Sequence, residues 1–174
     1  MKIEKGMTQD VDELERLYDD LNDYLAANIN YPGWKKGIYP VRETAENAIS
    51  EGNLYVAREG ERIAGSVILT HKPEAAYAKA KWNTDDDYDR IFVIKTFVVH
   101  PDYFKKKVGQ SMLDFACVLA EDQDIVSIRL DAYESNVPAI RLYEKNGFKY
   151  VDTVDLGIGE AYGLKWFRLY EKVI

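Results

Sequence analysis

Hydrophobic and polar residues repeat along this chain with two different periods, which predict helices in some segments and strands in others. Between positions 10 and 27, apolar side chains recur at the three- and four-residue spacing of an amphipathic helix, whose buried face is Val11, Leu14, Leu17, Tyr18, Leu21 and Leu25. The opposite face is acidic, and we interpret it as a solvated surface. Similar patterns predict helices at 41–50, 108–120 and 137–146.

The strand signals are shorter and lie between the helices. Alternating or continuous apolar runs predict strands at 2–5, 53–58, 63–70, 91–99, 126–131, 148–156 and 164–173. The prolines and glycines of segment 28–40, NINYPGWKKGIYP, indicate a loop. Segment 72–90 is polar and has no clear period, so we expect an excursion away from the sheet.

This order of elements indicates an α/β (α+β layered) fold with a mixed sheet. The strand at 91–99, the helix at 108–120 and the strand at 126–131 form one crossover unit. A right-handed crossover makes the two strands parallel neighbours and places the start of the helix at the carboxyl edge of the sheet. With 174 residues and no repeat or linker, we expect residues 1–174 to form a single domain.

Composition narrows the classes of partner. Thirty acidic and 23 basic residues give a net charge of −7, which disfavours nucleic acid and mildly favours a cationic small molecule. No apolar run is long enough for a membrane helix, and the start of the chain lacks the apolar core of a signal peptide, so we expect a cytoplasmic protein with no membrane partner. Cys117 is the only cysteine, which excludes an internal disulfide.

The turn before the helix at 108–120 is a candidate phosphate site. The first backbone N–H groups of a helix have no partner within the helix, and the helix dipole favours an anion there. The turn supplies three lysines, and the start of the helix supplies a glycine and backbone amides. The candidate residues are Lys105, Lys106, Lys107, Val108, Gly109, Gln110 and Ser111. A lysine-rich turn that is simply solvated is the alternative.

Two stretches together resemble the acyl-CoA-binding signature of the GNAT superfamily of N-acetyltransferases. VVHPDYFKKKVGQSML (98–113) is similar to its first half at Val99, Pro101, Gly109 and Leu113. DAYESNVPAIRLYEKNGF (131–148) is similar to its second half at Asn136, Ala139, Tyr143, Gly147 and Phe148. The chain departs from the signature where Phe104 replaces an arginine or glutamine and Lys107 replaces the first glycine.

The resemblance implies a mostly antiparallel, twisted mixed sheet flanked by helices, and direct acetyl transfer from acetyl-CoA to an amine. It implies that the backbone of Phe97, Val98 and Val99 contacts the acetyl and pantetheine groups of this co-substrate, with Asn136 also on the ligand. It assigns Tyr143 as the general acid for the leaving thiolate. The general base stays open between Glu134 and Asp131. Homodimers are common in the family.

The acceptor is predicted to be the primary amine of a small molecule, although a protein N-terminus fits the charge equally well. Tyr31, Trp34 and Tyr39 are candidate acceptor contacts, and local packing of the loop is the alternative. A non-catalytic acyl-CoA-binding or regulatory module is the second functional hypothesis. A structural partner protein that uses this loop as an interface is the third. The two histidines lack metal-ligand spacing, so no metal is expected.

Overall fold

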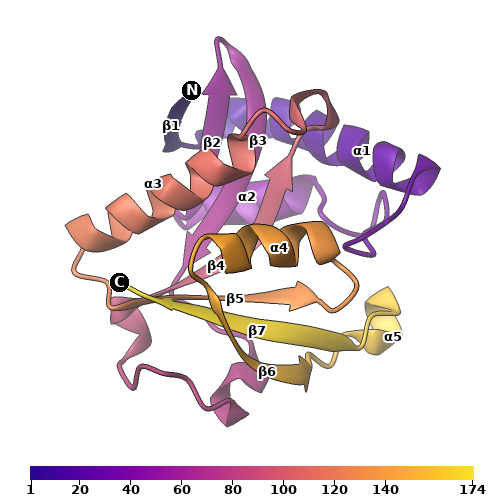
Figure 1. Ribbon diagram of the computed structural model, residues 1–174. Coiled ribbons are helices and arrows are strands. Elements are labelled where there is room, and N and C mark those ends of the chain that lie inside the picture. Colours follow the sequence, from indigo (N-terminus) through magenta and orange to yellow (C-terminus); the bar gives the residue numbers. More distant parts are fainter. The chain divides into compact units, whose positions relative to one another are not determined.

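Figure 1 shows a computed structural model of the protein, which describes residues 1–174. The strands are β1 (Lys2–Lys5), β2 (Leu54–Glu59), β3 (Arg62–Thr70), β4 (Ile91–Val99), β5 (Ser127–Tyr133), β6 (Lys149–Asp155) and β7 (Trp166–Val173). The α-helices are α1 (Val11–Ala27), α2 (Arg42–Ser50), α3 (Val108–Asp122), α4 (Val137–Lys145) and α5 (Gly159–Tyr162). Short 3-10 helices are η1 (Thr8–Asp10), η2 (Ala75–Lys79), η3 (Tyr88–Arg90) and η4 (Pro101–Tyr103).

Every predicted helix and strand is present, and its ends lie within a residue or two of the prediction. The strands have the order β1-β2-β3-β4-β5-β7-β6 in a mixed, mostly antiparallel sheet. The predicted parallel pair is confirmed, since β4 and β5 run in register from Ile91 opposite Ser127 to Ile94 opposite Leu130. The unpredicted elements, α5 and the 3-10 helices, are too short to show a period.

The residues divide into two compact units. The first contains Met1–Asn30, Trp34–Leu69 and Thr96–Phe115. Its core joins the apolar face of α1 to α2 and to β2 and β3, through Leu14, Leu17, Tyr18, Leu21, Leu25, Ala45, Ala48, Leu54, Val56, Ile63, Ile68 and Val98. The acidic face of α1 is exposed only in part, because Glu13 is half-buried and accepts a hydrogen bond from Ile63 N at 2.7 Å. At its exposed edge, Arg42 Nη1 lies 2.7 Å from Asp12 and 2.8 Å from Glu15. Exposed pairs of this kind contribute little to stability.

Gly65 in β3 permits a close approach of elements in this unit. A Cβ atom at this position would lie 2.7 Å from the backbone oxygen of Val98 and 3.0 Å from Cγ1 of Val108, at the start of α3. We expect Gly65→Ala to lower the free energy of unfolding in urea by about 1–3 kcal/mol, because backbone atoms cannot move aside as a side chain can. Gly159→Ala is the control, since its nearest neighbour would be 3.8 Å away. An equal stability of the two variants would contradict the prediction.

The second unit contains Tyr31–Gly33, Thr70–Lys95 and Ala116–Ile174. In it, α4 lies across one face of β5 and β7 (Figure 1). A buried ion pair holds the polar excursion at 72–90. In this pair, Arg129 Nε lies 3.3 Å from Glu171 Oε1, and the two residues are directly opposite each other in the adjacent strands β5 and β7. No helix of the chain has the length and apolar character to cross a membrane.

Candidate functional site

The turn before α3 has an unusual backbone. Lys105 and Lys107 both have positive φ, at 61° and 63°, the region that favours glycine. Backbone of this kind can form a concave anion site, although the N–H of Lys106 is already used, since it donates to the carbonyl of Tyr103 at 3.2 Å. All three lysine side chains of the turn are exposed, so their charge surrounds the turn. The lysine found where the signature has its first glycine thus keeps the glycine's conformation.

The start of α3 differs in one respect from the sequence prediction. The N–H of Ser111 donates to the carbonyl of Lys107 at 2.9 Å, so the prediction that this amide is free is wrong. The bond closes the first turn of the helix. Val108 is buried, while Gly109 and Gln110 are half-buried on the outer side of the helix.

Aromatic residues hold the turn in place. The ring of Phe104 meets that of Tyr24 in α1 edge to face, with centroids 5.2 Å apart. Tyr103 is buried, and its ring lies 5.0 Å from Lys106 Nζ and 5.7 Å from the guanidinium of Arg62. Phe104 therefore anchors the turn where the signature has a polar residue. Arg62, which sequence reasoning missed, adds a cation beside it.

Because Lys107 has positive φ, we expect Lys107→Gly to raise the free energy of unfolding. A left-handed residue with a Cβ costs about 1–2 kcal/mol, and part of this gain is lost because glycine has more freedom in the unfolded chain, leaving about 0.5–1 kcal/mol. Urea denaturation measures the difference. Lys106→Gly is the matched control, since Lys106 lacks a positive φ and its replacement should not stabilise the protein. Equal effects would show that strain at Lys107 is absent.

The end of β4 has a second backbone irregularity. Thr96 is 7% exposed, has a φ of 46°, and its hydroxyl is hydrogen-bonded to that of Tyr39. A β-branched residue at positive φ is an outlier, and strained residues of this kind cluster at functional sites. The predicted ligand contacts Phe97, Val98 and Val99 follow immediately, with Val98 buried and the other two half-buried.

The structure gives the aromatic loop residues defined packing. Trp34 packs on the core of the first unit and meets Tyr39 edge to face, with centroids 5.5 Å apart. The backbone carbonyl of Tyr39 accepts a hydrogen bond from Asn22 Nδ2 at 3.2 Å. Tyr31 belongs to the second unit and is half-buried. Contact of these three aromatic residues with an acceptor stays a prediction.

In the second unit, α4 carries Asn136 and Tyr143. Asn136 occupies the N-cap position, but its side chain makes no capping hydrogen bond, which leaves its amide group available to a ligand. The helix ends in a Schellman motif: the N–H of Gly147 donates to Glu144 O and the N–H of Phe148 to Tyr143 O, both at 3.1 Å. Gly147 supplies the left-handed residue, with φ 84°.

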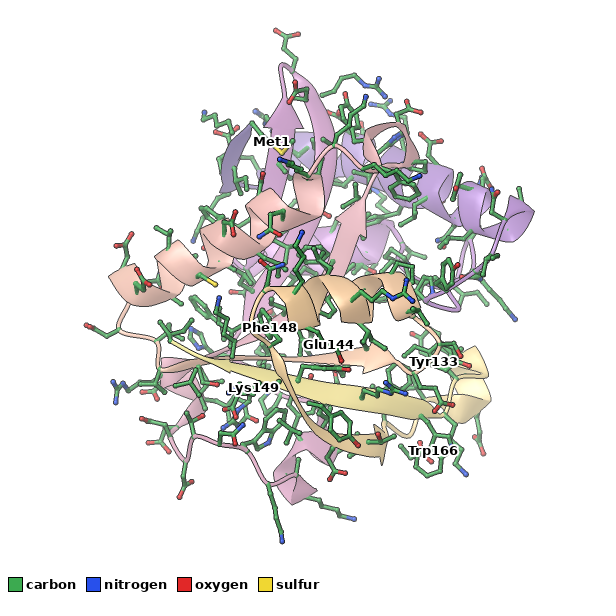
Figure 2. The ribbon with its side chains drawn as sticks, in the orientation of Figure 1. Met1, Tyr133, Glu144, Phe148, Lys149 and Trp166 are labelled. Carbon is green, nitrogen blue, oxygen red and sulfur yellow. The ribbon has the colours of Figure 1, made fainter.

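This helix end also positions Tyr143. The ring of Phe148 packs against the Tyr143 ring with centroids 5.9 Å apart, the hydrophobic contact that accompanies the motif. Figure 2 shows Phe148 and Glu144 at this end of α4, and Tyr170 of β7 donates a hydrogen bond to Glu144 at 3.1 Å. Tyr143 is 5% exposed, and this burial raises its pKa well above the ordinary value, with the nearby Asp131 carboxylate contributing. Its hydroxyl therefore stays protonated at neutral pH.

Asp131 lies in a separate polar cluster of the same unit. The hydroxyl of Tyr77, from η2, donates to Asp131 Oδ2 at 2.6 Å. Lys95 Nζ of β4 lies 2.6 Å from Glu74 Oε1, and both charges act on Asp131. Burial raises the pKa of Asp131 to about 6, with the Glu74 charge adding to this, while the Tyr77 hydrogen bond and Lys95 oppose the rise.

The other candidate base, Glu134, is in a different setting. Its side chain is exposed just beyond β5, and its N–H donates to the carbonyl of Trp166 at 3.1 Å (Figure 2 labels Tyr133 and Trp166 here). Sequence reasoning missed the partners of Asp131, because Tyr77 and Glu74 lie in a segment without a period. No group of three or more His, Cys, Asp or Glu side chains gathers in a metal-binding arrangement.

Comparisons with known proteins agree with this geometry. Residues 14–148 match the model of the acetyltransferase (GNAT) family. An acetyltransferase of the GNAT family from Streptococcus agalactiae has a similar fold, with a TM-score of 0.79 and 19% identity over 99% of this chain and 95% of the other. PaiA N-acetyltransferase from Thermoplasma acidophilum, in complex with coenzyme A, has a TM-score of 0.70 and 20% identity, over 99% of this chain and 98% of the other.

Two further relatives extend this picture. The ribosomal-protein-S18-alanine N-acetyltransferase from Escherichia coli has a TM-score of 0.71 and 15% identity, over 99% of this chain and 93% of the other. UPF0157 protein YqkA of Bacillus subtilis is 39% identical over 75 residues. That match spans 43% of this chain and only 21% of the Bacillus protein.

Proposed function

This chain belongs to the acetyltransferase (GNAT) family, and we propose that it transfers an acetyl group from acetyl-CoA to the primary amine of a small molecule. The observation that carries the proposal is the turn before α3. There, Lys107 holds the left-handed conformation at the position where the signature has its first glycine, and Lys105 is left-handed as well. A chain with no use for that turn would gain stability from ordinary backbone at both positions.

The turn is suited to the diphosphate of coenzyme A. The start of α3 supplies a helix N-terminus, which favours an anion, and Lys105, Lys106, Lys107 and Arg62 supply positive charge in a chain of net charge −7. A basic patch in an otherwise acidic protein selects an anionic ligand by local rather than overall charge. The diphosphate thus has both hydrogen bonds and charge complementarity.

The transfer step needs no covalent enzyme intermediate. The neutral amine attacks the thioester carbon, a C–N bond forms, the nitrogen loses one proton to a base or to water, and the C–S bond breaks as the carbonyl is restored. In our proposal the backbone at Phe97–Val99 orients the acetyl group, and Tyr143 gives its proton to the leaving sulfur. A tyrosine whose pKa is raised by burial is protonated over the whole neutral range, as an acid must be.

The acceptor class rests on charge and composition. An acidic surface attracts amines, which are cationic in solution, and the loop with Trp34 and Tyr39 offers aromatic faces that bind cations. A peptide N-terminus is also an amine, and the Escherichia coli relative acts on a ribosomal protein. We propose a small-molecule acceptor, and a substrate screen can distinguish it from a peptide N-terminus.

Titration calorimetry with acetyl-CoA and with CoA tests the first step. We expect saturable binding of both, weakening as salt is raised, because charge contributes to the diphosphate contact. Release of free thiol from acetyl-CoA then reports transfer, in a panel of polyamines, amino acids, aminoglycosides and a peptide with a free N-terminus. Binding without turnover on any amine would favour the second hypothesis, a non-catalytic acyl-CoA-binding module. Absence of binding at millimolar ligand would contradict both.

A further inference from the structure

We infer that His100 is a positioning residue for the turn before α3: its neutral imidazole caps η4, and protonation of the ring releases the cap and weakens binding of the coenzyme A diphosphate. The inference rests on the proposed function, because it concerns the turn that is proposed to bind this ligand. All the residues that carry it lie in the first unit. Binding of the co-substrate, rather than acetyl transfer itself, would thus become sensitive to pH.

The imidazole of His100 is buried and held through both of its nitrogens. His100 is 7% exposed, and its Nδ1 accepts a hydrogen bond from the backbone N–H of Asp102 at 3.1 Å, which is the capping bond of η4. Its Nε2 lies 3.1 Å from Oδ2 of Asp20 in α1. A ring nitrogen that accepts a hydrogen bond carries no proton, so these contacts assign the neutral tautomer whose hydrogen is on Nε2 and is donated to Asp20.

Protonation of this ring is incompatible with the capping bond. The second proton would be on Nδ1 and would point at the N–H of Asp102, so that two donors would face each other. Another acceptor is close by, because Oδ2 of Asp102 lies 3.8 Å from Nδ1. The same carboxylate oxygen lies 3.5 Å from Nη2 of Arg62. A protonated ring would therefore exchange the N–H of Asp102 for its carboxylate, and the cap would be lost.

The charged and titratable groups around His100 come from three elements. Asp20 belongs to α1, Asp102 and Tyr103 belong to η4, and Arg62, which pairs with Asp102, belongs to β3. The Tyr103 ring meets the imidazole edge to face, with centroids 6.0 Å apart. Because one carboxylate lies beside each ring nitrogen, the two together neutralise much of the charge that the imidazole gains. Loss of the cap, rather than the added charge, is then the effect that reaches the turn.

Consecutive backbone hydrogen bonds connect η4 to the turn. The N–H of Tyr103 donates to the carbonyl of His100 at 2.9 Å, and the N–H of Lys106 donates to the carbonyl of Tyr103 at 3.2 Å. The Tyr103 ring also lies 5.0 Å from Lys106 Nζ. A change at the start of η4 therefore displaces the residues that lie just before α3, including one of the three lysines of the turn.

The energy of the cap sets the size of the effect. Loss of an N-cap disfavours the capped conformation by a factor of about five. A ligand that binds only the capped conformation loses affinity by up to this factor. Histidine rings gain their second proton between about pH 5 and 8. We therefore expect the affinity for the diphosphate ligand to fall by about three- to fivefold between about pH 8 and pH 5.5.

The test is titration calorimetry at these two pH values with coenzyme A that lacks its 3′-phosphate. Phosphate monoesters change their charge near about pH 6, so removing this group leaves a ligand whose diphosphate keeps its charge throughout the range. The pKa of Asp131 is also about 6. Protonation of that carboxylate would remove a negative charge, however, and would strengthen the binding of an anion rather than weaken it.

Two substitutions separate the two nitrogens of the ring. His100→Asn keeps an oxygen that can accept from the N–H of Asp102 but has no second proton to gain, so its affinity should match that of the wild type at the higher pH and should not fall at the lower one. His100→Gln can reach Asp20 but does not supply the cap, so its affinity should be about three- to fivefold lower at both pH values. In both variants kcat at saturating acetyl-CoA should be unchanged, because only the binding step depends on the cap.

The other histidine of the chain is the matched control. Nδ1 of His71 lies 2.7 Å from the carbonyl oxygen of Tyr88 and 2.9 Å from that of Ile91, so this nitrogen is a donor and caps no N–H group. His71→Gln should therefore keep the full pH dependence of binding. Nitrogen NMR of the imidazoles at the higher pH needs no variant at His100, and it should show the His100 proton on Nε2.

The outcomes separate the role of His100 from the proposed function. A wild type that binds neither acetyl-CoA nor the ligand without the 3′-phosphate contradicts the proposed function, and the role of His100 with it. An affinity that is equal at both pH values, or that falls equally in His100→Asn, overturns the role of His100 alone. A proton on Nδ1 at the higher pH does so as well, since that nitrogen could not then accept the bond from Asp102. A kcat that falls together with the affinity in His100→Gln also overturns it, because the effect would then extend beyond the turn.

Discussion

Replacing Tyr143 by phenylalanine is expected to lower kcat by about 100-fold or more, while the affinity for acetyl-CoA changes by less than about twofold. The ring keeps its packing against Phe148 and the end of α4 is unchanged, so only the hydroxyl is lost. Without it the thiolate must leave unprotonated or wait for water. Rapid-quench or thiol-release kinetics give kcat, and calorimetry gives the affinity.

A companion substitution shows whether the effect is specific. Tyr150 is exposed at 54% in the same unit, and Tyr150→Phe removes a hydroxyl that bonds only to Thr153, so we expect wild-type kinetics. The pH profile is informative too. Because the pKa of Tyr143 is raised, the protonated acid should persist and kcat should show no alkaline limb below about pH 10. Full activity of the Tyr143→Phe variant would show that Tyr143 is not the general acid.

Replacing Glu171 by glutamine is expected to lower the free energy of unfolding by about 3–5 kcal/mol, which is the cost of leaving a buried charge without its partner. Glu171 is 1% exposed and Arg129 is 3% exposed, and their side chains lie opposite each other in β7 and β5. Glu171 also accepts hydrogen bonds from Asn83 N at 2.6 Å and Ser127 Oγ at 2.7 Å. Urea denaturation measures the loss.

The control uses an exposed pair from the same region. Arg90 and Asp86 are 3.1 Å apart at the surface, and Asp86→Asn should cost less than about 1 kcal/mol. The double variant Arg129→Met/Glu171→Met should be more stable than Glu171→Gln, because no charge is then left unpaired. If Glu171→Gln lowers the free energy of unfolding no more than Asp86→Asn does, the buried pair does not stabilise this unit.

The same residue predicts how stability depends on pH. Burial raises the pKa of Glu171, but the hydrogen bonds from Thr84, Ser127 and Asn83 and the charge of Arg129 outweigh it, so the pKa lies below its ordinary value. A lowered pKa means that the unfolded chain binds the proton more readily. This part of the stability is therefore complete above about pH 4.5 and is lost as the pH falls through the folded pKa. Glu171→Gln should lack this acid-sensitive component.

The sequence predicts much of the fold because the elements have strong, simple signals. The helix at 108–122 has a clean apolar face, and the run at 91–99 has the composition of a buried strand, so the parallel crossover follows from chirality. The helix end at Gly147 and Phe148 is equally local, since both capping bonds lie within a few residues. Local bonds and periodic burial are what a sequence displays directly.

The features that could not be predicted from the sequence depend on contacts between distant segments. Tyr77 meets Asp131 from 54 positions away, and Tyr39 meets Thr96 from 57 positions away, and neither pairing leaves a pattern in the chain. Arg129 and Glu171 look like ordinary charged residues in strands, although they are among the most buried polar side chains. The sequence could not distinguish the surroundings of Asp131 from those of Glu134 for the same reason, because the partner of Asp131, Tyr77, comes from a segment without a period.

The anchoring of segment 72–90 couples two properties that are usually treated separately. Its later part is fixed by Glu171 and by the rings of Trp82 and Tyr88, which lie 4.3 and 5.2 Å from the Arg129 guanidinium, and its earlier part supplies Tyr77 to Asp131. Burial raises the pKa of Asp131, and this segment contributes both the Tyr77 hydrogen bond that lowers it and the Glu74 charge that raises it, so loosening of the segment would change the pKa of Asp131. Substitutions that weaken the contacts of Arg129 and Glu171 would therefore alter both the heat stability of this unit and the protonation of Asp131.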